Sequence, residues 1–457
     1  MAHNTDVKAD ASAPPVTRIL AEFVATHPSQ GWSDDVDAEA RRTFQNCLGC
    51  AIGAARHPTA EAALAAVAEL EPPPQATVLG RSERVDIANA AFVNGVMSHT
   101  FDFDDTHLKT IIHPAGPVAS AALAVAERAG SSGRELVDAV VLGIDVACRV
   151  GNAIYPEHYD RGWHITGSTG MLGAAAACAR LLRLSKEQTV MALGIAASQP
   201  IGVREQFGTM TKPFHPGAAA RAGLMSALLA RHGYTASMRA LEAPRGLMQT
   251  YSTKCAWNEI DDALGRRFEI SFNTYKPFAC GIVIHPSIDG CSQLAAAHRL
   301  TADDIERIDL VVHPLVLELT GKRSPRTGLE AKFSVYHACA AGILFGRAGE
   351  AEFADALVTR PDVMALRDRV HATIDPAIDE AAADVTIACR DGRRLHLRVE
   401  HALGSLERPM SNADLARKFH GLVDPILGDA RATALIEACG DLGAAADVRV
   451  LTSLARA

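Results

Sequence analysis

Alanine, leucine and valine recur at helical spacing through the first half of the chain, from about residue 15 to residue 267. Short polar breaks separate these stretches. Two breaks carry a serine followed three residues later by Glu or Gln, at Ser132–Glu135 and Ser185–Gln188. This spacing is typical of a helix N-terminus, where the two side chains satisfy free backbone N–H groups. The pattern therefore predicts a series of helices.

Three glycines, Gly167, Gly170 and Gly173, begin one of the alanine-rich stretches. A row of small residues allows a neighbouring helix to pack closely, and we prefer this interpretation to a phosphate-binding loop. The chain contains neither a dinucleotide-binding fingerprint nor a Walker lysine loop.

The pattern changes near residue 268. Ile308–His313 is short, apolar and β-branched, as expected of a strand. Asp384–Glu400 alternates and contains Asp391-Gly392, which predicts a hairpin. Helical stretches lie between these strands, at Pro286–Arg299 and Lys332–Phe345.

After about Pro409 the pattern is helical again, with Ser411–Asp414 as a helix start. We therefore expect a mainly α fold with two domains. Residues 1–267 and 405–457, from both chain ends, form a large all-helical domain, and residues 268–404 form an inserted, smaller α+β lid domain. A cleft between two domains is a common place for a ligand.

The composition describes a soluble globular protein. Of 457 residues, 48% are hydrophobic, 21% charged and only 5% aromatic. The net charge of −8 argues against nucleic acid as the main partner, because phosphate binding needs a basic face.

The N-terminus, Met1–Arg18, lacks the apolar core of a signal peptide, and no apolar run reaches membrane-spanning length. The ten cysteines are scattered, so we expect a reducing, cytoplasmic location without a membrane. Cys47 and Cys50 have metal-binding or redox spacing, but they lie in a helical stretch and we interpret them as core residues.

Charged residues are concentrated in one short segment, His99–His113. Its carboxylates are Asp102, Asp104 and Asp105, and it also holds three histidines. Groups at that density are costly to order unless they pair, bind a ligand or exchange protons.

Three kinds of chemistry fit this segment. The aspartates could bind Mg²⁺, or His99, Asp102 and His113 a transition metal. A carboxylate beside an imidazole could perform acid–base catalysis without further ligands. Helix capping by Asp105 or Thr106, with surface charge for the rest, is the third interpretation. The calcium-loop pattern and the aspartate-rich box of prenyl-transfer enzymes do not match.

Other histidines and lysines lie at proline- or glycine-bounded breaks. His164 precedes the glycine-punctuated helix, Lys212 and His215 share a turn, and Lys276 begins the second domain with His285 beyond it. The chain has few lysines and many arginines, so two Lys-Pro pairs are suggestive. Ammonium groups beside a cleft would neutralise a substrate with two or three carboxylates.

Taken in order, these segments resemble the MmgE/PrpD family, which includes 2-methylcitrate dehydratase, cis-aconitate decarboxylase and iminodisuccinate epimerase. The resemblance covers nearly the whole chain and rests on the following segments: Asn94-Gly95, His99–Thr106, His113–Gly116, Gly162–His164, Met210–Pro213, His215–Gly217, Tyr275–Pro277 and His285. It implies the two-domain fold, a homodimer, and chemistry on a small polycarboxylate without metal or organic cofactor.

By position, the resemblance also implies the site residues. These are Asp102, Thr106, His113, His164, Lys212, Lys276 and Tyr336. Leu108–Ile112 departs from the dehydratase and decarboxylase patterns, which points to a changed substrate.

The family's reactions all handle a proton or carbanion next to a carboxylate. We expect Lys212, Lys276 and Thr106 to bind substrate, and His113 and His164 to act as base and acid. Asp102 would orient or polarise an imidazole. Tyr336 would donate or relay a proton.

We expect a dehydratase first, with epimerisation and decarboxylation as alternatives. Outside the family, a metal-dependent helical hydrolase and a non-catalytic helical scaffold are the other hypotheses.

Overall fold

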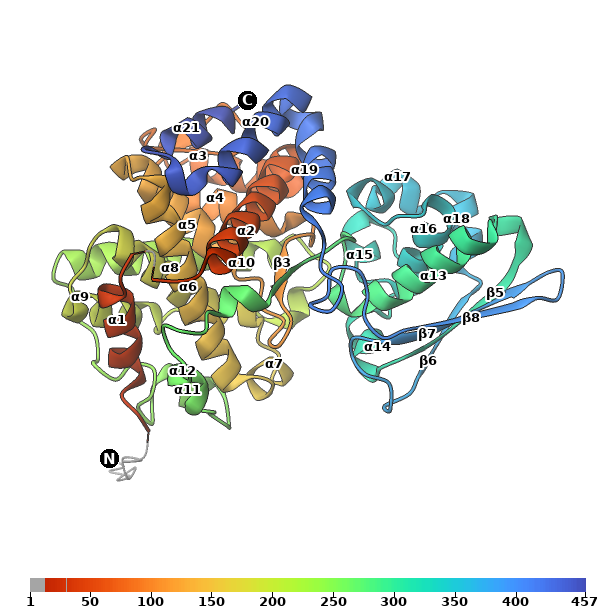
Figure 1. Cartoon of the computed structure of the whole chain (residues 1–457), viewed down its shortest axis with the longest axis horizontal. Helices are drawn as coiled ribbons and strands as arrows, with labels where there is room; N and C mark the ends of the chain where they lie inside the picture. The colour runs from red at the N-terminus through yellow and green to blue at the C-terminus, as the bar shows by residue number, and fades with distance from the viewer. Residues whose placement is uncertain (1–12, 30) are drawn as a thin grey trace.

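The computed structural model describes residues 13–29 and 31–457. Helices from both ends of the chain form one unit, and the middle of the chain forms a second unit beside it (Figure 1). We call these the helical unit (α1–α12 and α19–α21) and the smaller unit (η4 to β8, Ile282–Val399). The described residues are 58% helix and 9% strand, which confirms the mainly α fold. The exact domain boundaries at 267/268 and 404/405 stay a prediction.

The helical unit contains fifteen α-helices within the described ranges. They are α1 (Val16–Thr26), α2 (Asp34–Gly53), α3 (Pro58–Ala68), α4 (Ile87–Thr100), α5 (Ala115–Ala129), α6 (Gly133–Ile154), α7 (Glu157–Asp160), α8 (Ile165–Leu181), α9 (Lys186–Ala196), α10 (Thr211–Arg231), α11 (Leu247–Tyr251), α12 (Asn258–Asp261), α19 (Asn412–Leu427), α20 (Asp429–Gly440) and α21 (Arg449–Leu454).

The smaller unit combines short helices with one sheet. Its elements are α13 (His285–His298), β5 (Ile305–Val312), α14 (Pro314–Thr320), α15 (Gly328–Ala331), α16 (Val335–Phe345), α17 (Asp355–Val358), α18 (Pro361–Arg367), β6 (Val370–Ile374), β7 (Ala383–Cys389) and β8 (Arg394–Val399).

Two short strand pairs and several single 3₁₀ turns complete the chain. They are β1 (Ala76–Thr77), β2 (Arg84–Val85), β3 (Asp105–His107), β4 (Asn273–Tyr275), η1 (Ala54–Arg56), η2 (Arg204–Gln206), η3 (Glu269–Phe272), η4 (Ile282–Ile284), η5 (Ala302–Asp304), η6 (Glu350–Phe353) and η7 (Leu442–Ala444).

Small residues allow the central helices α4, α5, α6, α8 and α10 to pack closely. A Cβ on Gly173 of α8 would lie 2.5 Å from the Gly143 carbonyl oxygen of α6, and one on Gly170 would lie 2.5 Å from Pro117. A Cβ on Gly95 of α4 would lie 2.7 Å from Gly217 of α10. The predicted close packing at the glycine row is therefore confirmed.

The helix starts expected from the sequence carry the predicted caps. Ser132 and Glu135 begin α6 with a reciprocal capping box, and Ser185 with Gln188 does the same for α9. A third box, at Ser411, begins α19. Such caps satisfy backbone N–H groups that have no partner within the helix.

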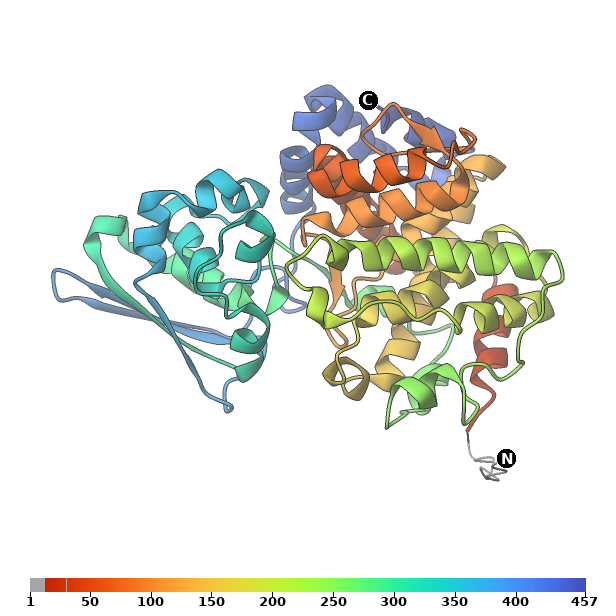
Figure 2. The ribbon, with the colours of Figure 1, turned by 180° about the vertical axis from the view of Figure 1, so that it is seen from behind.

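The sheet of the smaller unit has the strand order β6-β5-β7-β8. β5 is parallel to β6 and antiparallel to β7, and the β7–β8 pair is the hairpin expected from Asp391-Gly392. Gly392 has φ of 87°, a conformation that glycine adopts without strain. The helix α13 packs against β7 and β8 and contacts α16 (Figure 2).

The C-terminal helices return to the helical unit, where α19 and α20 pack on α2. The end of the chain therefore lies beside its first third (Figure 1). No helix in the described ranges is both long and apolar enough to span a bilayer. All ten cysteines are free, and Cys47 and Cys50 are buried in the core as predicted.

Candidate active site

The acidic segment follows the end of α4 and lies against β4, the strand that precedes the smaller unit. Asp102 has φ of 51°, so the chain reverses direction directly after α4. β3 then pairs antiparallel with β4, with Asp105 opposite Tyr275. This pairing brings Asp102 next to Lys276, although 174 residues separate them.

The Asp102 carboxylate is the centre of the site and holds two ammonium groups. Its Oδ1 lies 2.6 Å from Lys276 Nζ and 2.8 Å from Lys212 Nζ, and all three residues are buried. Burial alone would raise the pKa of Asp102, but the ammonium groups bring it well below its usual range. Within the described ranges, Oδ2 of Asp102 has no hydrogen-bond partner.

The two lysines differ in their surroundings. Lys212 lies in the first turn of α10, with Nζ 5.1 Å from the Phe207 ring and 5.2 Å from the Phe333 ring. Burial lowers the pKa of Lys212, although Asp102 opposes this shift. For Lys276, burial is outweighed by Asp102 and Asp104, which raise its pKa.

His113 has a defined tautomer. Its Nδ1 lies 2.7 Å from the carbonyl oxygen of Asp105, and a carbonyl only accepts hydrogen bonds, so Nδ1 carries the proton. Nε2 is then free to accept a proton. Burial is the main cause that lowers the pKa of His113, to about 3, so the ring is neutral in this state.

His164 is the N-cap residue of α8 and lies beside a second histidine. Its Nδ1 is 2.9 Å from Nδ1 of His215. Burial first and His215 second bring the pKa of His164 well below its usual range, and burial lowers that of His215 to about 4. The ring centroids of His113 and His164 are 6.4 Å apart.

Sequence reasoning did not assign a site role to the pair His99 and Asp104. The Asp104 carboxylate lies 2.7 Å from Nδ1 of His99, and the His99 ring is 4.7 Å from that of His113. Burial would raise the pKa of Asp104, but the charges of His99 and His113 lower it. A histidine in the last turn of a helix, five residues before an aspartate, was the available signal.

Asp105 plays the capping role that was one of the hypotheses. Its Oδ2 accepts hydrogen bonds from the Ala115 N–H at the start of α5 and from the Asn273 side chain. Burial, and secondly the charge of Asp104, raise its pKa to about 7. Asp105 therefore joins α5 to β4.

Lys212, Lys276, Asp102, His113 and His164 line one cavity. Its other walls are mostly apolar and consist of Ile111, Tyr159, Phe207, Gly281, Ile282, Val283, Leu319, Thr320 and Phe333. The cavity has a volume of about 30 Å³, room for no more than about two water molecules. The site is therefore closed in this structure, because small-molecule pockets usually measure about 300–1,000 Å³.

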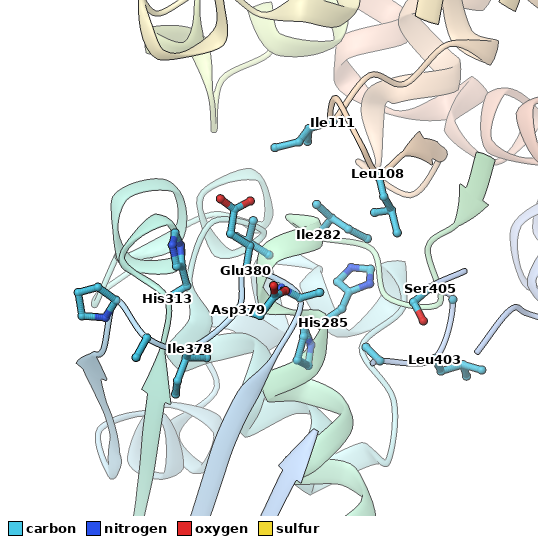
Figure 3. A pocket seen from close by; sticks show the side chains of 17 residues that line it. Leu108, Ile111, Ile282, His285, His313, Ile378, Asp379, Glu380, Leu403 and Ser405 are labelled. Carbon is cyan, nitrogen blue, oxygen red and sulfur yellow. The ribbon is translucent and has the colours of Figure 1, made fainter. Parts of the chain in front are cut away.

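A larger pocket of about 590 Å³ adjoins the closed cavity, and Ile111, Ile282 and Val283 line both spaces. Figure 3 shows Ile111 on the helical unit facing Ile282 on the smaller unit. Ile111 has φ of 57°, which is strained for a β-branched residue. The two spaces therefore share part of their walls.

Two of the residues expected at the site lie outside the cavity lining. Thr106 on β3 contacts His113, with Oγ1 3.3 Å from Nδ1. Tyr336 in α16 is buried, and the guanidinium of Arg323 lies 4.6 Å from the centre of its ring. A substrate-binding role for Thr106 and a proton-relay role for Tyr336 stay predictions.

The donor set could also hold a metal ion. One ring nitrogen of each of His99, His113 and His164 lies within 4.8 Å of the others. A second such group is His99, Asp102 and Asp104. In this group Asp102 is already paired with Lys212 and Lys276, and Asp104 is paired with His99. The arrangement is better suited to binding an anion with the two ammonium groups and exchanging a proton with the two neutral imidazoles.

Comparison with known proteins places the chain in a wider context. The family profile MmgE/PrpD N-terminal domain matches residues 18–260, and the profile MmgE/PrpD C-terminal domain matches residues 278–442. The chain is 29% identical to the cis-aconitate decarboxylase of Homo sapiens over 400 residues, which cover 83% of this chain and 81% of that protein.

Two further relatives are similar over most of their length. The cis-aconitate decarboxylase of Aspergillus terreus (strain NIH 2624 / FGSC A1156) is 26% identical over 471 residues, covering 96% of this chain and 95% of the relative. The 2-methylcitrate dehydratase of Escherichia coli (strain K12) is 24% identical over 394 residues, which cover 79% of this chain and 80% of that protein.

Proposed function

The chain belongs to the MmgE/PrpD family, and we propose that it is a lyase that acts on a small di- or tricarboxylate by moving a proton at the carbon next to a carboxylate. One observation carries the proposal: two ammonium groups share one buried carboxylate beside two neutral imidazoles in the same closed cavity.

Lys212 and Lys276 would bind the substrate. A substrate carboxylate entering the cavity would share Lys212 and Lys276 with Asp102, so that two carboxylates would face two ammonium groups. Charge that develops on the substrate carboxylate in the transition state would be stabilised by these fixed ammonium groups. A well-placed donor of this kind typically contributes roughly 3–4 kcal/mol.

The imidazoles of His113 and His164 would transfer the proton. His113 carries its proton on Nδ1, so Nε2 can accept a proton from the carbon next to the carboxylate. The negative charge of a bound polycarboxylate raises the pKa of nearby imidazoles, which allows one of them to return a proton as an acid. The variants described below test whether both His113 and His164 take part in proton transfer.

The bond that breaks determines the product. In decarboxylation the C–C bond to a carboxylate breaks, CO₂ leaves, and an imidazolium protonates the remaining electron pair. In dehydration the imidazole removes the C–H proton, and the hydroxyl leaves as water after protonation. We place decarboxylation of a cis-aconitate-like acid first, because the decarboxylases match more of this chain at higher identity than the dehydratases do.

Dehydration of the 2-methylcitrate type is the second candidate, supported by the relatives that carry that name. The apolar wall formed by Ile111, Ile282 and Leu319 would accommodate an alkyl substituent. Epimerisation needs the same acid–base pair on opposite faces of one carbon and remains the alternative.

Proton NMR in D₂O with purified protein tests the proposal. The panel is cis-aconitate, citrate, 2-methylcitrate, malate and iminodisuccinate. We expect CO₂ loss from cis-aconitate, or a new alkene signal from a hydroxy acid; C–H exchange alone would indicate epimerisation. If no acid in the panel changes, while the protein is folded, the proposed chemistry is wrong.

Cofactor independence is part of the proposal and has its own measurement. Activity should be the same before and after dialysis against a chelator. A loss that added Zn²⁺ or Mg²⁺ restores would instead support the metal-dependent hydrolase hypothesis. The homodimer and the cytoplasmic location stay predictions.

A further inference from the structure

Three consecutive backbone carbonyls at the centre of the site each accept a hydrogen bond from a different lysine. Lys332 Nζ lies 2.7 Å from the Phe101 oxygen, Lys276 Nζ 3.1 Å from the Asp102 oxygen, and Lys418 Nζ 2.5 Å from the Phe103 oxygen. The three lysines come from three parts of the chain: Lys332 follows α15, Lys276 follows β4, and Lys418 lies in α19 near the C-terminus.

Lys332 and Lys418 each have a second partner on the segment that carries Lys276. Lys332 Nζ also donates to the Ala279 oxygen at 2.9 Å, and Lys418 Nζ to the Lys276 oxygen at 2.9 Å. Each ammonium group therefore joins the turn at Asp102 to the 276–279 segment.

The turn that these lysines hold is conformationally strained. Asp102 has φ of 51°, and a non-glycine residue keeps such a conformation only when its surroundings enforce it. A charged donor on the carbonyl before Asp102, on its own carbonyl and on the one after it supplies this constraint, since charge-assisted hydrogen bonds are the stronger kind.

Neither Lys332 nor Lys418 lines the catalytic cavity. Lys332 is buried, and Glu350 neutralises it at 2.5 Å. Lys418 is half-buried, with Nζ 4.0 Å from the centre of the Phe103 ring. Their hydrogen bonds to the turn and to the 276–279 segment are made with backbone carbonyls, so these bonds can affect the reaction through the positions of Asp102 and Lys276.

We propose that Lys332 and Lys418 are positioning residues, which hold Asp102 at the distance from Lys276 that the reaction needs. Lys332 belongs to the smaller unit and Lys418 to the C-terminal helices, so the two lysines connect both parts to the same turn. The catalytic geometry is then completed only when the smaller unit lies closed on the helical unit.

This arrangement predicts that kcat depends on pH through the protonation of Lys418. Burial lowers the pKa of Lys418 to about 8. The titratable groups that face it are the Cys50 thiol, Asp104 and Asp105, which oppose the shift, and Lys276, which adds to it. Above this pH the uncharged amine binds the two carbonyls more weakly. The account expects an alkaline decline in kcat that depends on residue 418.

Lys418→Met is the main test, since methionine keeps an unbranched side chain at this half-buried position and the fold should survive. Lys418→Arg keeps a charge at all relevant pH values, and Lys186→Met removes an exposed lysine of α9 as the matched control. Hydrogen exchange of the full chain is measured in peptides covering 101–107 and 273–281.

We expect exchange in both peptides to be at least about tenfold faster in Lys418→Met and unchanged in Lys186→Met. We expect kcat/KM of Lys418→Met to fall roughly tenfold to a hundredfold, the size of effect that a small misplacement of catalytic groups produces. The alkaline decline of kcat should move to higher pH in Lys418→Arg and disappear in Lys418→Met.

Unchanged protection of both peptides in Lys418→Met would overturn the inference, as would an alkaline decline that is the same in all three proteins. The kinetic readout rests on the proposed function, whereas hydrogen exchange needs no substrate. A protein that turns over no polycarboxylate but loses protection in Lys418→Met would refute the proposed function and support the positioning role.

Discussion

At the scale of single residues, the properties of the site follow from one buried carboxylate. Asp102 pairs with two ammonium groups inside a closed cavity. Removing the carboxylate leaves both ammonium groups buried without this counter-charge, and breaking a buried pair in this way typically costs about 3–5 kcal/mol.

Asp102→Asn therefore has a defined expected outcome. We expect the free energy of unfolding to fall by about 3 kcal/mol or more, because Lys212 and Lys276 would repel each other without a carboxylate between them. Urea unfolding followed by circular dichroism measures this. The control Asp362→Asn removes an exposed ion pair with Arg360 and should cost less than about 1 kcal/mol. Equal losses in the two variants would contradict the central role of Asp102.

The sequence could identify these residues but not their partners. Resemblance and residue chemistry together singled out Asp102, His113, His164, Lys212 and Lys276, and the structure brings all five to one cavity. The hydrogen bonds of Lys332 and Lys418 could not be predicted from the sequence. They are made to backbone carbonyls far away in the chain, and such bonds leave no pattern in residue type.

At the scale of helices and strands, sequence motifs predicted the structure well where the residues that interact are close together in the chain. The capping boxes of α6 and α9 and the β7–β8 hairpin depend on residues within a few positions of one another. The β3–β4 pair joins two strands of three residues that lie far apart in the chain, and strands this short carry no periodicity. Its position depends on tertiary packing.

The crossing of α6 and α8 offers a test of packing. In Gly173→Ala the new Cβ would lie 2.5 Å from the Gly143 carbonyl oxygen, so the helices must separate. We expect the free energy of unfolding to fall by about 1–3 kcal/mol. Gly421→Ala in α19 is the matched control, since a Cβ there meets nothing within 4 Å, and it should be neutral or stabilising by up to about 1 kcal/mol. A neutral Gly173→Ala would show that this crossing is not tight.

At the scale of the whole molecule, two units enclose the reaction, and the buried imidazoles affect the fold as well as the chemistry. Burial is the main cause that lowers the pKa of His113 and His285 to about 3, and of His158, His215 and His337 to about 4. Asp105 and Asp145 are shifted the other way, to about 7 and about 6, also mainly by burial.

These shifts predict how stability depends on pH. Between about pH 4 and 6.5 the unfolded chain protonates histidines that stay neutral in the fold, so stability falls as the pH falls through this range. The two raised carboxyl groups oppose this trend, but five histidines outweigh them. We expect Tm to decrease by roughly 5 °C or more from pH 7 to pH 5.

The matched variants for this measurement are His337→Gln and His298→Gln. His337 is buried away from the cavity, and its replacement should make the decrease in Tm smaller, whereas replacing the exposed His298 should not. A Tm that is constant between pH 7 and pH 5 would contradict the neutral, buried state of these histidines.

The central claim is that His113 and His164 move a proton at a substrate carbon held by two lysines. The most direct measurement follows solvent deuterium by NMR while the protein acts on its polycarboxylate in D₂O, with His113→Gln and His164→Gln beside the unchanged protein. We expect decarboxylation to leave one deuterium at the carbon that lost CO₂, or dehydration to remove the C–H proton next to a carboxylate, and turnover to be at least about a hundredfold slower in both folded variants. A decarboxylated product without deuterium at that carbon, or near-normal rates in both variants, would contradict the claim.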